Sequence, residues 1–268
     1  MHRSVIAAIF FLSAACWTFT SAEAKGSLIV VGGGGTPDEV FELALALSGG
    51  SNAVIAVIPQ ASLSENRGVS TAEFFLNAGA REAVILETLN DNSTKGFLAR
   101  STLVWMPGGS QSRLMEEINA AGLSKVLKSM HDNDVNFGGT SAGTAVLSQL
   151  MLTGGADLES VTVGGTVLSE GLGLWPEVIV DQHALKRRRF NRLLAAVMDH
   201  SDRIGVAIDE KTAVVVNDSK FQVYGESTVL VIDGREAVIR EGVVEDIHSG
   251  TGLRLHVLKA GQTFDIQD

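Results

Sequence analysis

Short apolar runs of strand length alternate along the chain with longer amphipathic stretches. The apolar runs cover residues 27–31, 53–58, 83–86, 103–106 and 135–137. The stretches between them have the apolar spacing of helices and cover residues 37–47, 71–78, 112–121 and 123–131. Strands that are apolar throughout are buried on both faces, so this pattern predicts a parallel sheet covered by helices on both sides.

The pattern changes after residue 212. Short apolar runs separated by turn residues cover residues 213–216, 221–224 and 229–232. We expect a β-rich C-terminal end that completes the same domain, because no linker, repeat or low-complexity segment precedes it. The predicted fold is therefore an α/β three-layer sandwich with a mostly parallel sheet, in a single domain over residues 25–268.

The first 24 residues have the pattern of an export signal. The N-terminus is positively charged, residues 5–19 are mostly apolar, and residues 21–24 offer small side chains for cleavage after Ala24. The apolar stretch is short for a membrane span, which needs about 20 residues. A retained anchor and lipid attachment at Cys16 are the alternatives. The favoured interpretation is a signal peptide over residues 1–24 and a secreted or periplasmic mature protein.

Charge and cysteine content narrow the chemistry. The formal net charge is −10 at pH 7, and such a surface repels phosphate backbones, so we expect no nucleic-acid partner. Cys16 is the only cysteine, which excludes disulfides, thiolate catalysis and cysteine-bound metal from the mature chain. The histidines are well separated and form no His-Glu-x-x-His helix, so we expect no metal and no cofactor.

Four glycines at residues 32–35 follow the first predicted strand. Thr36 and Pro37 are then predicted to be the N-cap and the first turn of the next helix. The dinucleotide-binding pattern G-x-G-x-x-G fails because Pro37 or Asp38 stands at its third glycine, and no phosphate-loop lysine follows. Two interpretations stay open, a turn that closely approaches an active site and an ordinary loop.

A second glycine-rich turn surrounds a serine. Residues 139–143 match G-x-S-x-G and lie between a predicted strand and a following helix, as this motif requires. Such a turn exposes the Ser141 hydroxyl, and the N–H of Ala142 would face a developing oxyanion, helped by the positive end of the helix. The bare N–H groups of Gly108-Gly109, after another strand, suit the same purpose. A packed turn of small residues is the alternative, but the strand-turn-helix context favours a nucleophile.

A nucleophilic serine needs a base, and the base needs a group that orients it. His183 is the best placed histidine, because it follows the end of a predicted strand. Four carboxylates are candidates for the third group, and spacing alone does not choose among Asp209, Glu210, Asp181 and Glu159.

Five of the 21 basic residues lie between Lys186 and Arg192. A charged run of this kind is usually a solvated helix face, but this one begins directly after the strand end at residues 181–183. On a regular helix Arg189 and Arg192 are neighbours while Arg187 points elsewhere, so spacing does not bring all three into one pocket. Guanidinium groups suit bidentate binding of carboxylates, and a carboxylate-bearing substrate follows as a hypothesis.

Taken in order, these segments resemble the cyanophycinase family of serine peptidases, which are relatives of the aspartyl dipeptidases called dipeptidase E. The matching segments are residues 108–111, 138–143, 181–183 with the three arginines, and 208–213. The resemblance extends from the first strand to about Val216. It implies a sheet like that of class I glutamine amidotransferases, and it allows a homodimer.

The resemblance also implies roles for individual residues. Ser141 would attack, His183 would act as general base and then acid, and Glu210 would orient the imidazole. Gly109 and Ala142 form the expected oxyanion hole. The residues implied to line the substrate pocket are Gln111, Asp181, Gln182, Arg187, Arg189 and Arg192. The chain departs from the family pattern at Ala184, where an aromatic residue is usual, and at Ser110.

The substrate of cyanophycinases is cyanophycin, a polyaspartate with arginine on each side-chain carboxylate, and the product is β-aspartyl-arginine. We therefore expect a secreted serine exopeptidase that hydrolyses this polymer or related aspartyl peptides through an acyl-enzyme. One alternative is a dipeptidase for α- or β-aspartyl dipeptides. Another is a non-catalytic protein that captures acidic ligands with its arginines.

Overall fold

The computed structural model describes residues 25–156 and 159–268, and the predicted signal peptide lies outside these residues. The helices are α1 (Asp38–Leu47), α2 (Val69–Asn77), α3 (Asn92–Leu98), α4 (Gln111–Ala120), α5 (Ser124–Asp132), α6 (Ala142–Ala145) and α7 (Phe190–Asp199), with a short 3-10 turn at Gly50–Asn52. The strands up to the last helix are β1 (Leu28–Val31), β2 (Val54–Val57), β3 (Glu82–Ile85), β4 (Leu103–Met106), β5 (Asn136–Thr140), β6 (Leu150–Ala156), β7 (Thr166–Glu170) and β8 (Val178–Gln182). The strands after it are β9 (Ile204–Ile208), β10 (Thr212–Asn217), β11 (Lys220–Gly225), β12 (Thr228–Asp233), β13 (Val238–Ile239), β14 (Gly250–Thr251), β15 (Arg254–Lys259) and β16 (Thr263–Asp265).

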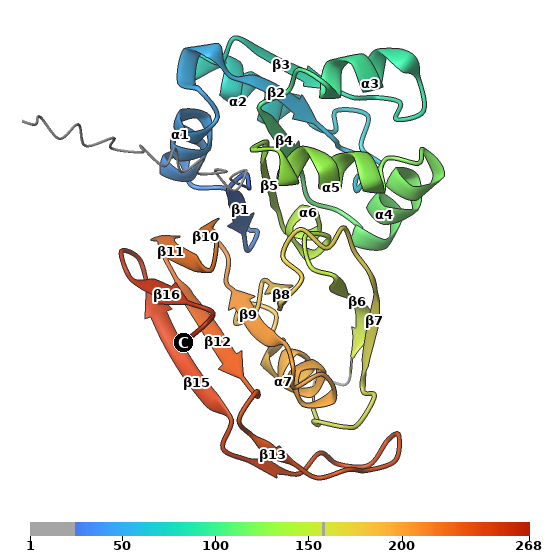
Figure 1. The fold of residues 1–268 in the computed structure, drawn as a ribbon, viewed down its shortest axis with the longest axis vertical. Coiled ribbons are helices and arrows are strands. Elements are labelled where there is room, and N and C mark those ends of the chain that lie inside the picture. Colours follow the sequence, from blue (N-terminus) through green and yellow to red (C-terminus); the bar gives the residue numbers. More distant parts are fainter. Residues whose placement is uncertain (1–24, 157–158) are drawn as a thin grey trace, which may run out of the picture.

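A large mixed sheet includes the parallel strands in the upper half of Figure 1. Within the described residues its strand order is β16-β11-β10-β1-β5-β4-β2-β3. Neighbouring strands pair in parallel in the series β1, β5, β4, β2 and β3. Strands β10, β11 and β16 extend the sheet beyond β1 by antiparallel pairing. The predicted α/β fold with a mostly parallel sheet is confirmed.

The inner parallel strands β1, β2 and β4 are buried on both faces, which explains their unbroken apolar runs, whereas the edge strand β3 is partly exposed. In β1, Leu28 and Val30 belong to the core shared with α4 and α5, while Ile29 and Val31 belong to the core shared with α1 and α2. Side chains alternate across a strand, so an apolar residue is needed at every position when helices cover both sides.

A second sheet is formed by β8, β9, β12 and β15, which all come from the C-terminal half of the chain. Its order is β15-β12-β9-β8, with β8 and β9 parallel and the other pairs antiparallel. Helix α7 packs on it through Leu193, Ala196 and Val197, against residues such as Ile179 and Ala207. The sequence pattern indicated only one sheet, because apolar runs in two separate sheets look alike.

Local boundaries differ from prediction in a few places. Helix α1 begins at Asp38, and its N-cap is Pro37 rather than Thr36, with no side-chain cap. The short helix α3 and the hairpin of β6 and β7 were not predicted. In the part of the chain that the structure describes, no helix has the length and apolar character needed to cross a bilayer.

Candidate active site

Ser141 lies on a strained turn between β5 and α6. Its backbone has φ 54° and ψ −113°, a conformation that non-glycine residues seldom adopt. The glycines on either side have a steric reason, since a Cβ at Gly139 would lie 2.3 Å and one at Gly143 1.8 Å from the carbonyl oxygen of Met106. The turn therefore rests directly on the end of β4, and small residues alone permit this.

The structure brings together the three residues of the predicted triad. The Ser141 hydroxyl lies 2.8 Å from Nε2 of His183, and Nδ1 of His183 lies 2.7 Å from Oε1 of Glu210. Ser141 follows β5 of the large sheet, whereas His183 follows β8 and Glu210 follows β9 of the second sheet. The site thus spans both sheets, whereas the sequence pattern indicated a single sheet.

The four-glycine run after β1 forms the wall behind the imidazole. A Cβ at Gly33 would lie 2.3 Å from Cε1 of His183, and a Cβ at Gly34 would lie 2.7 Å from Oε2 of Glu210. The backbone of this run also accepts hydrogen bonds from the segments it packs against, from His183 N to Gly32 O at 2.9 Å and from Lys211 N to Gly33 O at 2.8 Å. Of the two open interpretations, the close approach to the candidate site is the one found.

Among the four candidates for the third group, Glu210 is the one bound to the imidazole. Asp181 is instead fully buried and paired with Arg192. Asp209 accepts hydrogen bonds from Lys186 N at 3.0 Å and from the Ser227 hydroxyl at 2.9 Å. Glu159 does not take this role, because the carboxylate of Glu210 already binds Nδ1 of His183.

Two backbone N–H groups near Ser141 are available for an anion. The N–H of Ser141 itself donates to Val31 O at 2.9 Å and is therefore occupied. The N–H groups of Gly109 and Ala142 have no acceptor in the described part of the chain. The turn that carries Gly109 lies close to Ser141, since a Cβ at Gly108 would lie 3.4 Å from Cβ of Ser141. Helix α6 has only 4 residues, so it adds little of the dipole expected from the sequence.

Burial is the main influence on the charge of His183. Loss of solvent lowers the pKa of His183 below its ordinary value, the hydrogen bond to Glu210 opposes this, and the nearby Arg187 lowers the pKa further. The imidazole is therefore neutral at pH 7. A neutral imidazole whose Nδ1 donates to Glu210 presents an unprotonated Nε2 to the serine, which is the state that a general base requires.

The residues predicted to line a substrate pocket differ in what they contact. Arg192 donates from Nε to Oδ2 of Asp181 at 2.8 Å and makes a second short bond from Nη2 to Oδ1, which forms a buried bidentate pair. Gln111 is buried and donates to the carbonyl oxygens of Leu152 and Thr153 in β6. These contacts hold the walls of the site.

The other two arginines lie nearer to solvent. Arg189 donates from Nη1 to the backbone and side-chain oxygens of Gln182, and burial lowers the pKa of Arg189 to about 10. Arg187 is exposed, and its guanidinium has no hydrogen-bond or ion-pair partner among the described residues. Residues 184–188 form a turn rather than a helix, and Arg189 is the N-cap of α7. A role in binding substrate stays a prediction for the whole set.

Sequence reasoning left the role of one contributor to the site open and missed that of another. The contacts of Gly33 and Gly34 with the imidazole and the carboxylate could have been inferred only from their place after a parallel strand. The hydrogen bonds that Asp209 accepts from Lys186 and Ser227 could not be inferred from the sequence, which shows only a carboxylate next to Glu210. The described residues contain no group of histidine, cysteine and carboxylate side chains arranged to hold a metal ion.

Comparison with known proteins identifies the family. A cyanophycinase from Geminocystis herdmanii is 33% identical over 255 residues, which is 90% of this chain and 94% of the relative. A cyanophycinase from Synechococcus elongatus is 33% identical over 231 residues, which is 82% of this chain and 72% of the relative. The crystal structure of a peptidase from an acI-B1 Actinobacterium shares the fold with a TM-score of 0.68 at 21% identity, covering 91% of this chain and 98% of that one. The model of peptidase family S51 matches residues 28–224, so the chain belongs to this family and is a serine-type peptidase.

Proposed function

We propose that the protein hydrolyses aspartyl peptides by way of an acyl-enzyme formed on Ser141. The observation that carries this proposal is the continuous chain from the Ser141 hydroxyl to Nε2 of His183 at 2.8 Å and from Nδ1 to Glu210 at 2.7 Å. A hydroxyl, an imidazole and a carboxylate in this sequence are the groups that activate a serine for attack on a carbonyl carbon.

The geometry supports the following course of reaction. Nε2 of His183 takes the proton as the Ser141 oxygen attacks the carbonyl carbon, and Glu210 stabilises the imidazolium that forms. The N–H groups of Gly109 and Ala142 receive the negative charge on the tetrahedral oxygen. His183 then returns the proton to the leaving amine, and a water molecule activated by the same imidazole releases the acyl group from the serine.

The proposed substrate is the β-linked aspartyl-arginine polymer or a related aspartyl peptide. Two observations support it: the relatives described above are named cyanophycinases, and the exposed cation of Arg187 lies close enough to His183 to lower its pKa. An exposed guanidinium near the catalytic imidazole suits a substrate that carries a carboxylate near its scissile bond.

The proposal extends to fold class, location and assembly. The layering of helices on both faces of the parallel strands supports a class I glutamine amidotransferase-like core. A secreted or periplasmic protein that acts on an external polymer or on scavenged peptides follows from the export pattern of residues 1–24. A homodimer is the proposed assembly, on the basis of the family resemblance.

The decisive assay offers the purified protein the polymer and a panel of α- and β-aspartyl dipeptides, with products identified by mass spectrometry. Release of β-aspartyl-arginine from the polymer is expected, and cleavage of dipeptides alone would assign a dipeptidase instead. Ser141→Ala should reduce kcat by about 10⁴-fold or more with the fold intact. Full activity in that variant would exclude the acyl-enzyme.

Glu210→Gln tests the orienting role separately. It preserves the shape of the side chain but favours the wrong tautomer of His183, and kcat should fall roughly 10²- to 10⁴-fold. Glu226→Gln is the matched control, because Glu226 is an exposed carboxylate that contacts Lys211 rather than the imidazole. Comparable activity in both variants would remove Glu210 from the mechanism.

A further inference from the structure

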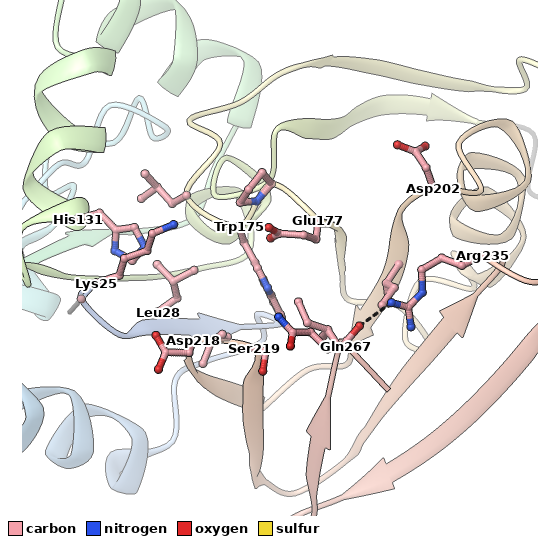
Figure 2. Close-up of a pocket in the computed structure, with 16 residues that line it drawn as sticks. Lys25, Leu28, His131, Trp175, Glu177, Asp202, Asp218, Ser219, Arg235 and Gln267 are labelled. Carbon is pink, nitrogen blue, oxygen red and sulfur yellow. Dashed lines mark hydrogen bonds between the residues drawn. The ribbon is translucent and has the colours of Figure 1, made fainter. Parts of the chain in front are cut away.

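A pocket lies at the ends of β8 and β9 that are opposite to the catalytic residues, and Figure 2 shows the residues that line it. Its volume is about 340 Å³, and its walls come from segments far apart in the sequence. Glu177 directly before β8 and Ile204 at the start of β9 line it, whereas His183 and Glu210 lie beyond the other ends of these strands. A five-residue strand spans roughly 15 Å, so the pocket and the catalytic residues do not overlap.

Trp175 crosses the middle of this pocket. Its side chain is buried, and its ring nitrogen has no hydrogen-bond partner among the described residues. Figure 2 shows the indole between Leu28 and Gln267, with the nitrogen on the side of Gln267. Buried polar groups nearly always form hydrogen bonds, so this N–H can donate to an acceptor on a ligand, such as a carboxylate oxygen.

His131 provides the complementary group on the wall formed by α5. Its ring hydrogen-bonds the backbone of Val135, and burial lowers the pKa of His131, so the imidazole is neutral. Nδ1 of the same ring is buried and has no partner in the described part of the chain. Because the other nitrogen carries the proton, Nδ1 is an acceptor that suits an ammonium or guanidinium N–H.

The charges around the pocket do not balance. Arg235 is held by Asp233 through Nε and Nη2, each at 3.0 Å, and Asp202 pairs with Arg203 at 3.3 Å. The three other charged residues of the lining are exposed and have no ion-pair partner within the described residues; they are Lys25, Glu177 and Asp218. The pocket therefore presents two unpaired carboxylates and one unpaired ammonium.

We propose that this pocket binds a basic amino acid. Such a ligand carries two cationic groups and one carboxylate, which is the complement of the unpaired charges. Its carboxylate meets Lys25 and the Trp175 N–H, and its cationic groups meet Glu177 and Asp218. The apolar stem packs on the indole, whose face attracts a guanidinium. The site is independent of the proposed peptidase function.

Calorimetric titration of the full chain tests this assignment, with the Ser141→Ala variant used so that no turnover contributes heat. L-Arginine should bind, whereas norleucine lacks the side-chain cation and agmatine lacks the carboxylate. Each of these two probes should bind about tenfold more weakly or worse, because each loses a charge-assisted contact. Equal binding of norleucine and arginine would overturn the proposal, as would the absence of arginine binding at millimolar concentration.

Variants locate the binding. Glu177→Gln and Asp218→Asn should each weaken arginine binding about tenfold, while Glu236→Gln, an exposed carboxylate outside the pocket, should leave it unchanged. Circular dichroism melting verifies that each variant is folded. Arginine should also shift Trp emission in the parent but not in Trp175→Phe. Affinity that survives both carboxylate variants would place the ligand elsewhere and refute the assignment.

Discussion

Asp209 holds the turn that carries His183. Its Oδ1 accepts a hydrogen bond from the backbone N–H of Lys186 at 3.0 Å, and its Oδ2 accepts one from the Ser227 hydroxyl at 2.9 Å. The carboxylate that directly precedes Glu210 therefore fixes the segment after His183, so adjacent residues orient the imidazole from two sides.

Asp209→Ala should release this turn. The loss of a hydrogen bond to a charged group costs about 1.5–3 kcal/mol when buried, and partial exposure reduces the effect to roughly 1 kcal/mol of unfolding free energy. We expect kcat/KM to fall about tenfold, with Asp209→Asn retaining most of the activity because its side-chain oxygen still accepts from Lys186. Steady-state kinetics and urea unfolding measure both effects. An alanine variant with unchanged kinetics would show that the clamp is dispensable.

Gly33→Ala should disable the site through a steric clash. The new Cβ would lie 2.3 Å from the His183 ring at a residue with φ +107°, so the ring must leave the position in which it contacts Ser141 and Glu210. Gly35→Ala is a closely matched control, because Gly35 has φ +104° and a Cβ added there would have no neighbour within 4 Å. Both should lose about 1 kcal/mol of stability from backbone strain. Only Gly33→Ala should lose most of its kcat, and equal activity would contradict the packing described.

The pH profile should have an acid limb set by His183. Burial lowers the pKa of His183 below its ordinary value near 6.5, and only the neutral imidazole accepts the serine proton. The value of kcat/KM should therefore rise with pH through this lowered pKa and stay level above it. Arg187→Gln removes a cation that lowers the pKa of His183, so the limb should move to higher pH.

Arg188→Gln is the control for this shift, because Arg188 is an exposed neighbour that is not among the groups acting on His183. Rate profiles, and NMR titration of the imidazole in the Ser141→Ala background, provide the measurement. A limb that moves to lower pH in Arg187→Gln, or by the same amount in both variants, would contradict the electrostatic account.

The buried pair of Asp181 and Arg192 should be costly to break on one side only. Arg192→Met leaves the fully buried Asp181 carboxylate uncompensated, and unfolding free energy should fall by about 3–5 kcal/mol. Replacing both, with Asp181→Leu and Arg192→Met, should restore much of the loss. Arg100→Met breaks the exposed pair with Glu82 and should cost far less, because solvent screens this pair. Chemical unfolding distinguishes these cases, and equal losses in both single variants would argue against burial as the cause.

The sequence contained more information about chemical identity than about arrangement. Parallel strands were predictable because burial on both faces requires unbroken apolar runs such as residues 28–31 and 103–106. The strained serine was predictable because its glycines tolerate close backbone approach. The division into two sheets was not, because residues 178–182 and 204–208 are as fully buried as residues 28–31 and show no sign that they belong to a different sheet.

The choice between Asp209 and Glu210 shows where pattern reasoning stops. Neighbouring side chains beyond a strand end point in different directions, and the direction depends on the positive φ of His183 and Lys211 and on the contacts of the glycine run. Spacing contains neither quantity. The ion pair of Asp181 with Arg192 likewise depends on how far the turn at residues 184–188 extends before α7 begins.

Because Ser141 follows a strand of the large sheet and its partners follow strands of the second sheet, hydrolysis depends on how these two sheets pack against each other. A shift of about one ångström between the two sheets would separate the Ser141 hydroxyl from the His183 imidazole while leaving every helix and strand folded. On heating, catalytic activity should therefore be lost at a lower temperature than the helix and strand signal in circular dichroism. Substitutions that strengthen the packing between the two sheets should raise the temperature at which activity is lost.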